Sequence, residues 1–181
     1  MSNFFVDVIS KDARFHSLKR ISDPRLLEPR TRAAVKAVIA DAAAHGIALM
    51  IFETYRSQER QTELFNQKAT QLRTVGVHHF GLACDLVKSI NGEPSWKGDF
   101  SFLGPIARAH GLVWGGDWGQ PNLPHSFGYN DHVQRCSVEM QAQLFRGDWY
   151  PGTNYSAFDL MAAWLTHDAW VRGHDVSLLT S

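Results

Sequence analysis

The chain has 181 residues, and its 18 Lys and Arg are balanced by 18 Asp and Glu, so it carries no net charge that would direct it to nucleic acid or anionic lipid. Apolar residues make up 44% of the sequence, enough for one domain to bury a core without partner subunits, and we expect a monomer. Its two Cys, Cys84 and Cys136, exclude a disulfide framework and the paired Cys of a zinc ribbon.

The N-terminal apolar run is short. It has no preceding basic residues and is interrupted by Asp7, so we expect no secretory signal peptide. No uncharged apolar run elsewhere approaches the roughly 18 to 20 residues that cross a bilayer. The sequence therefore predicts synthesis in the cytoplasm and no membrane insertion.

A helix is predicted over residues 26–45. Its apolar residues recur at the spacing of one helical face, and they are Val35, Val38, Ile39 and Ala42. Gly46 follows where a helix commonly ends. The periodicity indicates an amphipathic helix that packs on a core.

The other predicted elements alternate between strand and helix. They are a strand at 47–52, a helix at 58–68 capped by Ser57, a turn and strand at 81–87, a helix at 100–110, strands at 112–114 and 132–134, and helices at 138–146 and 157–172. This order favours an α+β fold, with a small, mainly antiparallel sheet packed with helices. We expect a single domain over residues 1–181, in which residues 137–181 form a helical C-terminal extension.

Two segments carry side chains that bind metals. His78 and Asp85 stand seven residues apart, and His132 follows the Gly-rich segment 115–130. A catalytic zinc ion takes three protein ligands and leaves one position to water, and these residues meet that count. Such a spacing also arises by chance, and the helical His-Glu-x-x-His motif is absent. On an extended strand Cys84 points away from Asp85, so this thiol is expected in the core.

Four separated motifs strengthen this interpretation. In chain order they are Tyr55-Arg56-Ser57-x-Glu59-x-Gln61, His78-x-x-Gly81-x-Ala83-x-Asp85, Trp114-Gly115-Gly116-Asp117-Trp118 and His132-Val133-Gln134. Together they resemble the M15 family of peptidases, most closely its branch of L-alanyl-D-glutamate peptidases from phage endolysins and bacterial cell-wall enzymes. The resemblance covers roughly residues 26–134.

The resemblance implies the fold of hedgehog and zinc D-Ala-D-Ala peptidases, with Zn²⁺ bound by His78, Asp85 and His132. His79 is the alternative to His78, but only His78 keeps the seven-residue step to Asp85. The family also implies that Arg56 binds an anionic group of the substrate, and the planar guanidinium suits two-point contact with a carboxylate.

The sequence departs from the family at the general base. Relatives usually carry Asp or Glu three residues before the last His ligand, where this chain has Tyr129. Asp131 is the preferred substitute, provided that a local turn or bulge directs its carboxylate toward the metal site. Asp117 is the second candidate. Gly76 also stands where many relatives carry a Ser, two residues before the first ligand. The hydrogen bond by which such a Ser would support the ligands is therefore not expected in this chain.

The resemblance implies a zinc-dependent peptidase that hydrolyses a stem-peptide bond of peptidoglycan, in first place L-Ala–D-Glu. It would act on the cell wall, in the periplasm, after release or export. One alternative is a D-Ala-D-Ala carboxypeptidase or dipeptidase on the same scaffold. The other is a catalytically silent, zinc-containing module that binds the cell wall, suggested by Tyr129 at the usual position of the base.

Overall fold

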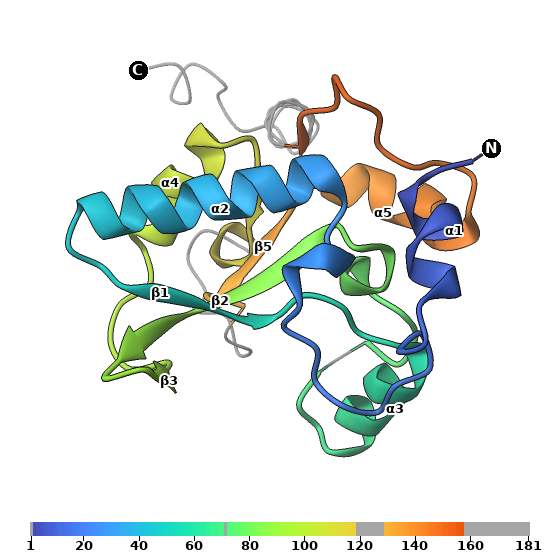
Figure 1. Cartoon of the computed structure of the whole chain (residues 1–181), viewed down its shortest axis with the longest axis horizontal. Coiled ribbons are helices and arrows are strands. Elements are labelled where there is room, and N and C mark those ends of the chain that lie inside the picture. Colours follow the sequence, from blue (N-terminus) through green and yellow to red (C-terminus); the bar gives the residue numbers. More distant parts are fainter. Residues whose placement is uncertain (1, 71, 119–128, 158–181) are drawn as a thin grey trace, which may run out of the picture.

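The computed structural model describes residues 2–70, 72–118 and 129–157 (Figure 1). The α-helices in these ranges are α1 (Phe4–Asp7), α2 (Pro29–Ala44), α3 (Gln58–Asn66), α4 (Leu103–Ala109) and α5 (Val138–Arg146). The strands are β1 (Leu49–Glu53), β2 (Ala83–Ile90), β3 (Glu93–Ser95), β4 (Val113–Trp114) and β5 (His132–Gln134). The helix predicted at 157–172 and the rest of the extension beyond residue 157 lie outside the described residues.

The described strands form one antiparallel sheet. Its order is β1-β2-β5-β4, and β3 pairs with the far part of β2. Helix α2 crosses one face of this sheet and contacts α4 (Figure 1). The α+β prediction is confirmed. No helix among the described residues is long and apolar enough to cross a membrane.

The main core lies between the sheet and the layer formed by α2 and α4. Val35, Val38 and Ala42 of α2 are at most 1% exposed, as the helical spacing predicted. They pack in one cluster with Cys84 and Leu86 of β2. Because side chains alternate along a strand, the face of β2 that carries Asp85 is turned away from this core. The expected orientation of Cys84 is therefore confirmed.

Several predicted boundaries were wrong. Helix α2 begins at Pro29 instead of residue 26, because Pro24–Leu26 forms a separate 3-10 turn and the Glu28 carboxylate caps the backbone N–H of Thr31. Strand β2 continues to Ile90, beyond the predicted residue 87, because its polar end pairs with both β1 and β3. The periodicity of α2 thus identified the buried face more accurately than the ends.

A second apolar cluster supports the 3-10 turn Val77–Phe80 that carries two histidines. Val77 and Phe80 pack there with the buried Leu144 of α5 and with Phe5 of α1. The backbone carbonyl of Phe80 also accepts a 2.8 Å hydrogen bond from the Tyr150 hydroxyl. Segments from both ends of the described chain therefore hold this turn in place.

A buried ion pair joins the start of α2 to the end of β5. Arg135 Nη1 lies 2.7 Å from Glu28 Oε2, and the two residues are 4% and 9% exposed. Arg135 Nη2 also donates to the carbonyl of Gly152. The described start of the C-terminal extension is therefore attached to the domain through Arg135.

We expect Arg135→Met to lower the free energy of unfolding by about 3 kcal/mol, because it leaves the Glu28 carboxylate buried without its cation. Urea denaturation followed by circular dichroism measures this change. Arg146→Met removes an ion pair to Asp148 whose side chains are 62% and 57% exposed, so the free energy of unfolding should be nearly unchanged. Equal effects of the two substitutions would contradict a stabilising role for the buried pair.

Candidate metal centre

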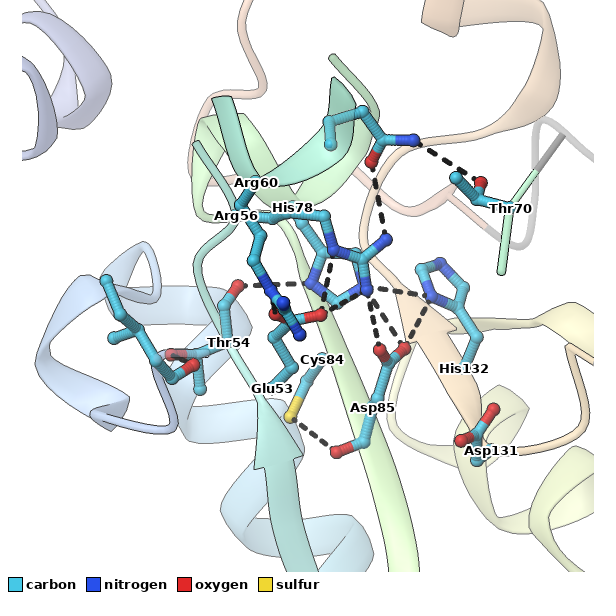
Figure 2. A network of polar contacts seen from close by, with 12 residues as sticks. Glu53, Thr54, Arg56, Arg60, Thr70, His78, Cys84, Asp85, Asp131 and His132 are labelled. Carbon is cyan, nitrogen blue, oxygen red and sulfur yellow. Dashed lines mark hydrogen bonds and ion pairs between the residues drawn. The ribbon is translucent and has the colours of Figure 1, made fainter. Parts of the chain in front are cut away.

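Three of the predicted site residues converge on the face of the sheet away from α2. Asp85 of β2 and His132 of β5 are directly opposed in the antiparallel register, and His78 reaches them from the Val77–Phe80 turn. Asp85 Oδ1 lies 3.1 Å from His78 Nε2 and 2.9 Å from His132 Nδ1. The two imidazole nitrogens are 3.2 Å apart (Figure 2). All three residues are less than 10% exposed.

The hydrogen bonds behind the histidines determine which nitrogens face the centre. His78 Nδ1 lies 3.2 Å from the backbone carbonyl of Thr54, which can only accept, so Nδ1 carries the proton. His132 Nε2 lies 3.0 Å from Gln134 Oε1, while the Gln134 amide nitrogen donates to the carbonyl of Cys136. This arrangement leaves His78 Nε2 and His132 Nδ1 with their lone pairs toward Asp85.

The inward-facing atoms are therefore three acceptors, and they suit a cation. The ligand atoms of His78, Asp85 and His132 all lie within 4.8 Å of one another. Two imidazole nitrogens and one carboxylate oxygen are a donor set that zinc commonly takes, with room for a further ligand.

Two glycines permit the close packing around these ligands. Gly81 ends the His78 turn with a φ of +70°, and a Cβ there would lie 2.6 Å from the Leu26 carbonyl oxygen. A Cβ on Gly115 would lie 2.3 Å from the carbonyl oxygen of Tyr129 and 3.1 Å from His132 Cβ. The Trp-Gly-Gly motif thus lets the chain leading to His132 approach β4 closely.

His79 does not share this centre. Its ring packs against Phe5 and Phe15, with centroids 5.3 and 5.2 Å away. Its Nδ1 lies 3.3 Å from the backbone carbonyl of Arg56. Burial lowers its pKa, which keeps the imidazole neutral in this aromatic environment. The structure therefore brings His78, and not the alternative His79, to Asp85 and His132.

Arg56 lies beside the centre rather than at an exposed strand end. Its Nε donates to Glu53 at 2.8 Å, and its Nη2 donates to the same carboxylate and to Asp85 Oδ2 at 3.2 Å. Its Nη1 has a longer contact of 3.4 Å with Gln61 Oε1. Burial opposes the charge, but Asp85 and Glu53 outweigh it and raise the pKa of Arg56. Arg56 was named from the sequence as a candidate site residue, but Glu53 was not.

The two candidate bases occupy different surroundings. Asp131 sits in a turn in which the His132 N–H donates to the Tyr129 carbonyl, and its carboxylate accepts a 2.7 Å hydrogen bond from Trp96 Nε1. Figure 2 places Asp131 on the His132 side of the centre, with no dashed line to the ligands. Burial and the nearby Asp85 raise its pKa to about 6. Asp117 instead forms an ion pair with Arg108 of α4.

The comparisons with known proteins point to a peptidase fold. The family model for D-alanyl-D-alanine carboxypeptidase, VanY, matches residues 24–102, which include His78 and Asp85. The chain is therefore similar to the VanY family of M15 peptidases, in agreement with the resemblance drawn from its motifs.

Two curated relatives carry more specific names. The chain is 29% identical over 134 residues to the peptidoglycan L-alanyl-D-glutamate endopeptidase CwlK of Bacillus subtilis, covering 61% of this chain and 80% of CwlK. It is 29% identical over 124 residues to the L-alanyl-D-glutamate peptidase of Listeria phage A118, covering 65% of this chain and 44% of the phage protein. The sequence match therefore spans less than half of the phage relative.

A solved structure shows the same fold. The L-Ala D-Glu endopeptidase ChiX of Serratia marcescens superposes with a TM-score of 0.50 at 21% identity, covering 65% of this chain and 90% of ChiX. At this identity the likeness concerns the fold alone. It supports the expected hedgehog and D-Ala-D-Ala-peptidase type of architecture.

Proposed function

We propose that the protein is a zinc-dependent peptidase that hydrolyses a stem-peptide bond of peptidoglycan, namely L-Ala–D-Glu. The observation that carries the proposal is the buried convergence of three acceptors from His78, Asp85 and His132 in a chain of a peptidase family. The names of the CwlK and phage relatives favour the L-Ala–D-Glu bond. The expected partner is the stem peptide, and the expected place of action is the cell wall after release or export.

In this proposal zinc, when bound by His78, Asp85 and His132, supplies a Lewis acid that lowers the pKa of water and polarises the scissile carbonyl. The Thr54 carbonyl and the Gln134 amide orient the two imidazoles. Asp131 takes a proton from the attacking water and transfers it to the leaving amine.

Arg56 is proposed to bind a carboxylate of the stem peptide. Its Nε and Nη2 are held by Glu53 and Asp85, whereas Nη1 has only the 3.4 Å contact with Gln61 among the hydrogen bonds of the described residues. Nη1 is therefore the edge best placed to contact a ligand, and the side chain is 17% exposed. Because Nε and Nη2 hold the guanidinium in place, its Nη1 edge is already oriented to bind a substrate carboxylate.

We expect Arg56→Lys to reduce turnover of muropeptides about tenfold or more, because an ammonium keeps the charge but loses the planar fork. The zinc content, measured by atomic absorption, should be unchanged. Arg146→Lys on α5, whose side chain is 62% exposed, is the matched control and should turn over normally. Wild-type rates for Arg56→Lys would show that the guanidinium does not bind the substrate.

Two other functions each have one supporting observation. The family model is named for a D-alanyl-D-alanine carboxypeptidase, and that reaction needs the same donor set. Tyr129 at the usual position of the base would suit a catalytically silent wall-binding module.

Zymography on purified cell wall separates the silent module from an enzyme. The proposed enzyme clears the wall, loses this clearing when a chelator is added and regains it when zinc is added. Binding without clearing would overturn the proposed function.

A further inference from the structure

We propose that Glu53 is a positioning residue of the metal centre, whose buried carboxylate holds the Arg56 guanidinium and so keeps Asp85 available to a cation. This inference rests on the metal site in the proposed function. It concerns a residue outside the proposed ligand set. The supporting observations are a bulge in β1, the hydrogen bonds of Arg56 to both Glu53 and Asp85, and two partly buried arginines beside Glu53.

A bulge in β1 places Glu53 beside Asp85. In the register with β2, Ile51 pairs with Leu86, but Glu53 pairs with Asp85, so Phe52 is the additional residue. Regular pairing would set Glu53 opposite Cys84, whose side chain lies in the core. The bulge instead directs the carboxylate to the face that carries Asp85. Bulges often re-aim a side chain beside an active site.

Glu53 is the principal anionic partner of Arg56. The residue is only 2% exposed, and its Oε2 accepts hydrogen bonds from both Nε and Nη2 of Arg56. Its Oε1 lies 3.4 Å from Arg60 Nε. Figure 2 shows both arginines reaching the Glu53 carboxylate. Glu53 therefore neutralises cationic side chains close to the centre.

The two oxygens of Asp85 face different neighbours. Oδ1 faces His78 and His132, whereas Oδ2 accepts from Arg56 Nη2 at 3.2 Å. Without the charge of Glu53, Asp85 would be the nearest remaining anion for Arg56, and the guanidinium would compete with the metal for it. Arg60 would add uncompensated positive charge nearby. Both effects weaken the binding of a divalent cation.

The test is the zinc affinity of the full chain, measured by competition with a chromogenic chelator. We expect Glu53→Gln to bind zinc about 10 to 100 times more weakly than wild type, as is typical for residues behind the ligands. Glu63→Gln is the matched control, since Glu63 also pairs with Arg60, at 3.8 Å, but is 42% exposed. Its zinc affinity should equal that of wild type.

The Arg56→Gln substitution tests the same idea from the other side. Arg56→Gln should bind zinc at least as tightly as wild type, and the double variant with Glu53→Gln should recover most of the lost affinity. The double variant also removes both charges together, so it avoids leaving Arg56 unpaired if Glu53→Gln alone folds poorly.

Equal zinc affinities of wild type and folded Glu53→Gln would overturn the inference and leave the proposed function intact. Weaker binding by Arg56→Gln, or no recovery in the double variant, would also overturn it, because Arg56 would then not be the competitor. A wild-type protein that binds no zinc would overturn the proposed function itself.

Discussion

Replacement of His78 by Ala is expected to abolish zinc retention and wall lysis together. The proposed centre has three ligands, and the loss of His78 Nε2 leaves one imidazole and one carboxylate on opposed strands. A catalytic zinc site with two protein ligands lies below the usual count of three. Asp85→Ala and His132→Ala should have the same effect, because each removes one of the three converging acceptors.

Zinc content by atomic absorption and clearing on cell-wall gels measure this result. His45→Ala is the control, because this imidazole contacts Asp41 and is 68% exposed, so zinc and lysis should be retained. Circular dichroism of each variant separates loss of metal from loss of fold. Stoichiometric zinc in folded His78→Ala would contradict the assignment and favour His79.

The second large effect is expected for Asp131. Asp131→Asn should keep zinc and the fold, because the amide has nearly the same shape and its oxygen can still accept the Trp96 N–H. Turnover should fall by roughly 10²-fold or more, the usual contribution of a general base. Steady-state hydrolysis of muropeptides measures the change, after equal zinc content has been verified for each variant.

Asp117→Asn is the control for Asp131. Asp117 is paired with Arg108 of α4, so its loss should affect turnover only mildly. If the two phenotypes were exchanged, Asp117 would be the base and Asp131 a group that orients His132. Near wild-type activity of both variants would show that neither carboxylate takes the proton.

The three residues that the sequence proposed as ligands do converge in the structure, and each belongs to a short motif whose spacing is local. The His78-to-Asp85 step depends only on the turn at Gly81 and the strand that follows. Gln134 was missed as the partner of His132, although residues two apart on a strand share a face, which was a usable signal. The Thr54 carbonyl carries no side-chain signal and could only be found in the structure.

Long-range pairings could not be predicted from the sequence. The position of Glu53 beside Asp85 could not be predicted, because strict alternation along a strand gives no indication of the bulge at Phe52. The Glu28–Arg135 pair joins residues that are distant in the chain, and neither residue lies in a motif that specifies a partner. The predicted elements between residues 29 and 146 were mostly correct in type, with errors of up to three residues at their ends.

The products of peptidoglycan digestion show whether the protein cleaves the L-Ala–D-Glu bond. Purified peptidoglycan is incubated with the zinc-loaded protein, and new amino termini and released amino acids are identified by mass spectrometry. We expect stem peptides that begin with D-Glu, with L-Ala left on the glycan and no free D-Ala. Release of D-Ala without new D-Glu termini would contradict the account and identify a carboxypeptidase or dipeptidase instead.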